Sequence, residues 1–371
     1  MNAEEDVFTG DLLIEDNKIK EIAEHIDVQA DQVIDARGKV LLPGFIQTHI
    51  HLCQTLFRGR ADDLELMDWL RQRIWPLEAA HDEESVYYSA MLGLGELISS
   101  GTTTILDMET VHHTDSAFQA MAQSGIRVIS GKVMMDHGDE VPEPLRENTA
   151  TSLQQSVDLL EKWNGFGGGR IQYAFCPRFV VSCTEELLVE VRDLSNKYHV
   201  KVHTHASENR GEIELVEHER GMRNIVYLDH IGLATPRLVL AHCVWLSEEE
   251  KEIIRKRGVK VTHCPGSNMK LSSGIADIPD LLNRQIAVGI GADVMDARTV
   301  LRMATMGGAE VLGMSKEIGS LEIVYSATRS CVDTVIIDGN IVLKNRKIQT
   351  IDRGIVLRES DKSIARLMKR I

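Results

Sequence analysis

The sequence predicts an α/β fold: a (β/α)8 barrel of the TIM type, with a small β-sandwich domain formed by the N- and C-terminal segments. Between residues 40 and 293, short runs rich in β-branched residues alternate with longer amphipathic stretches. Eight such units in about 250 residues match the length of a closed barrel. The two ends of the chain differ, because their short alternating runs are separated by Asn, Asp and Gly.

The eight expected strands are runs of Val, Ile, Leu or Thr, and the stretches between them have helical periodicity. That periodicity is clearest at residues 82–100, 184–199 and 246–258. An open, doubly wound sheet is the alternative, but no GxGxxG turn follows the first strand. The expected strands are residues 40–51, 102–108, 126–135, 170–177, 200–207, 237–244, 259–266 and 286–293.

The small domain is predicted to join residues 1–42 with residues 324–371, beside a barrel of residues 43–322. The segments GDLLIEDNKIKEIAE, QVIDARGKVLLPG and CVDTVIIDGNIVLKNRKIQTID all have the pattern of short antiparallel strands. Since the ends of a domain often lie close together, one β-domain built from both ends is the simplest assignment. The last residues, SDKSIARLMKRI, are expected to form a terminal helix.

Composition and charge exclude several classes of protein. The chain has 41 Lys and Arg against 56 Asp and Glu, a formal charge of −15, and no basic cluster that could neutralise nucleic-acid phosphates. No apolar run approaches the roughly 20 residues of a membrane span, and the acidic N-terminus is unlike a secretory signal. The six cysteines contain no CxxC pair, which is typical of a reduced, cytoplasmic protein and argues against a zinc ribbon.

Histidine and acidic residues recur where five of the predicted strands end. Active sites of such barrels lie at this end of the strands, and alternation places the two histidines of an HxH pair on one face. Imidazole and carboxylate groups are usual ligands of zinc. We therefore expect a metal site of His49, His51, His205 and Asp293. Glu208 and His242 have suitable chemistry for proton transfer. The strand-end residues are His49, His51, His203, His205, His242, His263 and Asp293.

Four motifs in this order resemble the mononuclear aminohydrolase branch of the amidohydrolase superfamily: PGFIQTHIH, HASE, AHC and GIGAD. The resemblance extends over nearly the whole chain. It implies a hydrolase that uses one divalent ion, zinc or else iron, to deaminate a heteroaromatic ring. Asp293 would accept the proton of the attacking water, His242 would orient that water, and Glu208 would protonate a ring nitrogen. Binuclear relatives carry a lysine where this chain has Arg178, which favours one metal ion.

Two sub-patterns point to different rings. The stretch from TLFRGRADDL to IWPLEAAH resembles deaminases of 5′-deoxyadenosine, methylthioadenosine and S-adenosylhomocysteine, in which the residue matching Glu78 receives the ribose hydroxyls. PRFVVSC, SEN and Gln54 resemble guanine deaminases, in which the residues matching Arg178 and Gln54 bind the purine edge. Trp75 is a candidate for stacking on the ring. Modified adenosine is the first choice, and guanine, pterin and triazine rings are alternatives. A non-catalytic metal-binding barrel is the alternative from another class.

At two junctions this chain is shorter than the family it resembles. Ala297 follows Asp293 almost at once, and Ile323 follows GSLE directly. The chain also begins about one strand late. We expect further residues at these places in the natural protein, since so short a link is unusual around an open site. An intact mass near 41.5 kDa would contradict this expectation. We also expect a homo-oligomer.

Overall fold

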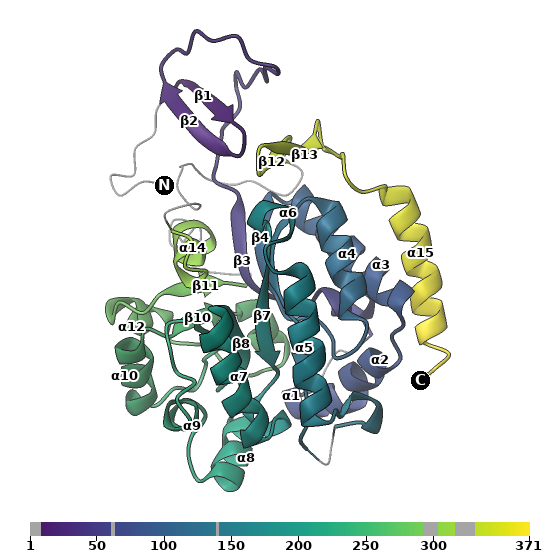
Figure 1. Ribbon diagram of the computed structural model, residues 1–371, viewed down its shortest axis with the longest axis vertical. Coiled ribbons are helices and arrows are strands. Elements are labelled where there is room, and N and C mark those ends of the chain that lie inside the picture. The colour runs from purple at the N-terminus through teal and green to yellow at the C-terminus, as the bar shows by residue number, and fades with distance from the viewer. Residues whose placement is uncertain (1–8, 61–63, 139–140, 292–302, 316–330) are drawn as a thin grey trace.

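The computed structural model describes residues 9–60, 64–138, 141–291, 303–315 and 331–371. Its centre is a closed barrel of eight parallel strands, which helices surround (Figure 1). Pairing between β11 (Val288–Ile290) and β3 (Phe45–Ile50) closes the ring, so the predicted (β/α)8 barrel is confirmed. The strands, in order around it, are β3 (Phe45–Ile50), β4 (Thr102–Asp107), β5 (Arg127–Ser130), β7 (Ile171–Pro177), β8 (Lys201–Ala206), β9 (Leu238–His242), β10 (Lys260–His263) and β11 (Val288–Ile290).

All eight predicted strand runs contain a barrel strand, but one of them holds two strands. The run 126–135 is divided into β5 and the short β6 (Val133–Met134), which pairs with the end of β7. Gly131 lies between them, and a Cβ atom there would come within 1.7 Å of the Ala174 carbonyl oxygen. The backbones approach too closely at this point for any residue except glycine.

Most of the longer barrel helices begin at side-chain caps that the sequence supplies. Asp82 caps α3 (Glu83–Ser99) by accepting a hydrogen bond from the Ser85 amide. Ser247 and Glu250 form a capping box at the start of α10 (Glu248–Arg257). Three glutamates stand in the first turn of α10 and three basic residues in its last, which suits the helix dipole. The longer helices of the barrel are α3 (Glu83–Ser99), α4 (Thr114–Ser124), α5 (Thr149–Trp163), α7 (Glu185–Tyr198), α8 (Arg210–Arg220) and α10 (Glu248–Arg257).

Shorter helices fill several loops of the barrel. Three of them follow β3: η1 (Leu52–Phe57), η2 (Leu70–Ile74) and α2 (Trp75–Ala79). Two of these carry residues that the sequence places in the site, Gln54 in η1 and Trp75 and Glu78 in α2. The others are α1 (Leu66–Trp69), η3 (Glu143–Leu145), α6 (Phe166–Gly169), η4 (Val180–Ser182), α9 (Asn224–His230), α11 (Pro265–Lys270), α12 (Ile278–Asn283), η5 (Met303–Gly307) and α14 (Gly308–Val311).

Both ends of the chain form antiparallel sheets, as predicted. The sheet of the N-terminal part is the hairpin of β1 (Asp11–Glu15) and β2 (Lys18–Ala23), and that of the C-terminal part contains β12 (Val335–Ile337), β13 (Asn340–Lys344) and β14 (Lys347–Ile348). The two sheets meet where Asn17 donates a 3.0 Å hydrogen bond to the Asp338 carboxylate. A separate β-domain of residues 1–42 and 324–371 remains a prediction.

The strand expected within QVIDARGKVLLPG is absent from the described residues, so that prediction is wrong. Val33 is 82% exposed and Val40 is 59% exposed. An alternating run becomes a stable strand only when one face is buried against a partner, and these side chains have no such cover among the described residues.

The predicted terminal helix is confirmed as α15 (Arg353–Leu367), which lies along α3 at the side of the barrel (Figure 1). Arg366 and Arg370 pair with Glu84 and Asp82 at the start of α3, at 2.9 and 2.7 Å. Within the described residues, no helix combines the length and apolarity that crossing a membrane requires.

Candidate metal centre and surrounding site

The ends of β3 and β8 bring three imidazoles to one point at the mouth of the barrel. His49, His51 and His205 can each place a ring nitrogen within 4.8 Å of those of the other two. The Nε2 atoms of His51 and His205 are only 3.1 Å apart. These three residues are among the predicted ligands, and a single ion between them would be bound by nitrogen atoms that a zinc site ordinarily uses.

The outer nitrogen of each of these rings has a fixed partner. The Nδ1 atoms of His51 and His205 each lie 2.8 Å from a backbone carbonyl oxygen, those of Met108 and Arg178. The Nδ1 atom of His49 lies 2.8 Å from Nε2 of His203, whose own Nδ1 lies 3.1 Å from the Val239 carbonyl oxygen. These contacts fix Nδ1–H as the donor in each ligand, so Nε2 keeps a free lone pair for a metal ion.

Burial keeps the three rings neutral, as metal ligands must be. It lowers the pKa of His51 to about 3, with a further contribution from Arg178. Burial and then the neighbouring histidines hold the pKa values of His49 and His205 well below the ordinary range. Three converging neutral imidazoles with their outer nitrogens engaged fit a divalent metal ion.

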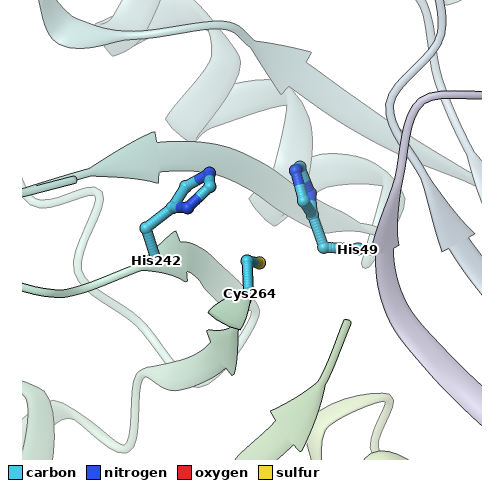
Figure 2. A group of neighbouring side chains, drawn as sticks. All are labelled: His49, His242 and Cys264. Atoms are coloured by element: carbon cyan, nitrogen blue, oxygen red, sulfur yellow. The ribbon is translucent and has the colours of Figure 1, made fainter. Parts of the chain in front are cut away.

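A second group of potential ligands shares His49. The potential ligand atoms of His242, the last residue of β9, and of Cys264, just after β10, also lie within 4.8 Å of that of His49. Figure 2 shows the rings of His49 and His242 turned toward the same space. The Cys264 thiol contacts the Thr262 carbonyl oxygen at 3.6 Å, and burial raises its pKa. Because the two groups share His49, they border the same space. The three histidines are the better ligand set, because the buried Cys264 thiol stays protonated.

Glu208 and His242 lie together beside these ligands. One carboxylate oxygen of Glu208 lies 3.3 Å from Nε2 of His242, and Nδ1 of His242 lies 2.7 Å from the side-chain oxygen of Asn268. Burial raises the pKa of Glu208 to about 8, and its other oxygen has no hydrogen-bond partner among the described residues. A carboxyl group with a pKa near neutrality can both donate and accept a proton, which proton transfer to a substrate requires.

The structure brings Gln54, Glu78 and Arg178 into one buried network. Arg178 donates two hydrogen bonds to the Glu78 carboxylate, at 2.5 and 3.1 Å, and Gln54 donates a third at 2.9 Å. Glu78 and Arg178 are each 2% exposed. A carboxylate has about four lone-pair positions, so Glu78 keeps room for one further donor.

Trp75 stands one helical turn before Glu78, in α2. It is 3% exposed, and its indole N–H has no partner among the described residues. A buried donor without a partner is uncommon and suits a contact with a bound molecule. The four predicted substrate contacts thus divide into three hydrogen-bonded residues and this one unpaired donor.

Asp293, the fourth predicted ligand and proton acceptor, lies outside the described residues, as do the two short junctions. Three residues of the site received no role from the sequence: His203 behind His49, Asn268 behind His242, and Glu109. Glu109 is fully buried, neither carboxylate oxygen has a partner among the described residues, and burial, Asp107 and Glu78 raise its pKa. Only His203 had a signal, since HTH places it on the face of His205.

Known proteins resemble this chain over most of its length. A 5′-deoxyadenosine deaminase from Methanobrevibacter smithii is 40% identical over 415 aligned positions, which cover 96% of this chain and 94% of the relative. A 5-methylthioadenosine/S-adenosylhomocysteine deaminase from Syntrophomonas wolfei is 37% identical, with coverage of 97% and 94%. Because these alignments extend over more positions than the 371 residues of this chain, the relatives have residues within the aligned range that this chain lacks.

The fold and the metal have a counterpart among solved structures. An adenosine deaminase from Xanthomonas campestris with bound zinc superposes with a TM-score of 0.84 at 26% identity, covering 96% of this chain and 93% of that one. The amidohydrolase family matches residues 40–298, which include His49, His51 and His205. The predicted resemblance is confirmed, and this chain belongs to the amidohydrolase family.

Proposed function

We propose that this protein removes the amino group of the adenine ring in 5′-modified adenosines, releasing ammonia and the inosine analogue. The observation that carries the proposal is the convergence of His49, His51 and His205 beside the Glu208–His242 pair. Two relatives that are named as deaminases of such adenosines support the substrate class; they are 40% and 37% identical to this chain over nearly its whole length. The buried network of Gln54, Glu78 and Arg178 supports a polar substrate.

We propose that His49, His51, His205 and Asp293 hold one divalent ion, zinc in the first instance. When bound, such an ion supplies Lewis-acid chemistry that makes water a nucleophile at neutral pH. The neutral imidazoles and the zinc of the Xanthomonas structure support this choice. The cytoplasmic location and the homo-oligomer remain predictions.

The remaining residues would handle the protons and the substrate. Glu208 would donate its proton to the ring nitrogen next to the amino-bearing carbon, and Asp293 would accept a proton from the attacking water. The proton from the water would leave with the amino group as ammonia, and Glu208 would recover its proton from the new hydroxyl group as the carbonyl forms. His242, held through its Nδ1 by Asn268, would keep its Nε2 toward the attacking water. Glu78 would use its remaining lone pair for a ribose hydroxyl, and Trp75 would lie against the purine.

The role of Glu208 is tested by the substitution Glu208→Gln, which preserves shape but removes the titratable proton. We expect turnover of 5′-deoxyadenosine to fall by about 10²- to 10⁴-fold, the usual contribution of a general acid–base group. Metal content should stay at one ion per chain, because Glu208 is not a ligand in this assignment. Ammonia release and metal analysis on one preparation check both points, and near-normal turnover would overturn the assignment.

A further inference from the structure

The turn that follows β8, residues 207–209, carries Glu208 and has an unfavourable backbone. Ser207 has φ of +53°, the left-handed region that residues other than glycine seldom occupy. Its carbonyl oxygen accepts hydrogen bonds from the amides of Val244 and Trp245, at 2.9 and 3.0 Å. This connects the turn to the segment after His242. Such a conformation persists only when surrounding contacts hold it.

The main contact that holds this turn from the other side is the carboxylate of Glu212. It accepts hydrogen bonds from the amides of Ser207 and Glu208, at 3.2 and 2.8 Å. A third donor, the side-chain amide of Asn224 in α9, lies 2.5 Å from it. Glu212 is fully buried. A buried carboxylate that binds the backbone of a proton-transfer residue fixes the position of that residue's side chain.

The location of Glu212 in its helix explains this reach. It is the third residue of α8, whose N-cap is Asn209. Side chains at this position point back over the helix start, where a glutamate commonly accepts the N-cap amide. Here the carboxylate reaches past the cap to the two residues before it. The helix start is thereby joined to the turn that presents Glu208.

We propose that Glu212 is a positioning residue, which holds the Glu208 carboxyl group against His242 so that proton transfer to substrate is efficient. This inference rests on the function proposed above for Glu208. Glu212 itself contacts neither the metal ligands nor the predicted substrate contacts in the described residues.

Glu250 provides a matched control on the next β/α unit. It is likewise the third residue of its helix, α10, and it is fully buried. It accepts hydrogen bonds from two backbone amides, Ser247 at 2.8 Å and Ile225 at 3.3 Å, and from Arg223. None of these partners belongs to the site. Glu250→Gln therefore changes similar bonding in a similar place without a direct contact to the Glu208 turn; it is linked to that turn only indirectly, through Arg223, which also donates a hydrogen bond to the Trp245 carbonyl oxygen at 2.5 Å.

The test compares Glu212→Gln, Glu250→Gln and Glu208→Gln by kcat, KM, metal content and melting temperature. A glutamine directs an NH2 group at one of the donors, so the turn loses one anchor. We expect Glu212→Gln to lower kcat by about 10- to 100-fold, the effect of a displacement near 1 Å, with KM changed less than about 3-fold. Glu250→Gln should lower the melting temperature comparably and leave kcat within about 2-fold.

Equal kcat values in Glu212→Gln and Glu250→Gln would overturn the positioning role. Should Glu212→Gln not fold, Asn224→Ala takes its place. It removes the side-chain amide that donates to Glu212 and little else, because the side-chain oxygen of Asn224 has no partner in the described residues. It should lower kcat by about 3- to 10-fold, and an unchanged kcat would contradict the inference. Normal turnover in Glu208→Gln would instead refute the proposed function, so the two failures can be told apart.

Discussion

The histidines of the site differ in what they do, although they are alike in sequence. The rings of His49, His51 and His205 turn Nε2 toward one point. Nε2 of His203 instead accepts a hydrogen bond from Nδ1 of His49. Strand alternation predicts that both members of each HxH pair share a face. It cannot distinguish a ligand from a supporting residue, because that depends on carbonyl groups within or just after other strands, those of Met108, Arg178 and Val239.

The supporting role of His203 predicts an effect on metal affinity. His203→Ala removes the acceptor that fixes the tautomer of His49, and loss of such outer partners typically weakens metal binding by about 10- to 100-fold. Competition with a chelator of known affinity measures this change. His112→Ala is the control and should leave affinity unaltered, because this histidine is exposed and its ring contacts the Pro144 carbonyl oxygen. A His203→Ala variant with parental affinity would rule out the role.

Among the elements, the strands and long helices were predictable and the turns between them were not. Each strand run has a local signature, and all eight contain a barrel strand. The predicted strands 200–207 and 237–244 extend past the ends of β8 and β9. The chain turns there instead, and Ser207, His242 and Cys243 all have positive φ. Nothing local marks these turns, since no glycine stands there. Contacts between neighbouring strand ends impose them.

The terminal helix α15 predicts a contrast between two leucines. Leu367 is fully buried at the end of this helix, and Leu357 is 45% exposed. Leu367→Ala should lower the free energy of unfolding by about 2–4 kcal/mol, because it leaves a cavity in a packed interior. Leu357→Ala should change it by less than about 0.5 kcal/mol. Chemical denaturation of both variants provides the comparison, and equal losses would contradict the packing of α15 on the barrel.

At the scale of the whole molecule, the sequence predicted the architecture because the β/α alternation is a local signal repeated eight times. The predicted convergence of His49, His51 and His205 at the strand ends is present in the structure, whereas their role as metal ligands stays a prediction. The pairing of Glu78 with Arg178, 100 residues apart, could not be predicted, because it depends on how α2 lies over the barrel. The same holds for Glu212, because its hydrogen bonds depend on the conformation of the turn at Ser207 and Glu208.

The most direct measurement is ammonia release by the purified protein, as isolated, after chelation, and after return of one equivalent of zinc. The substrates would be 5′-deoxyadenosine, methylthioadenosine, S-adenosylhomocysteine, guanine, a pterin and an aminotriazine. We expect turnover of the modified adenosines, at least about 100-fold slower without metal and restored by zinc. Unaltered turnover by metal-free protein, or no ammonia from any of these rings, would contradict a metal-dependent deaminase.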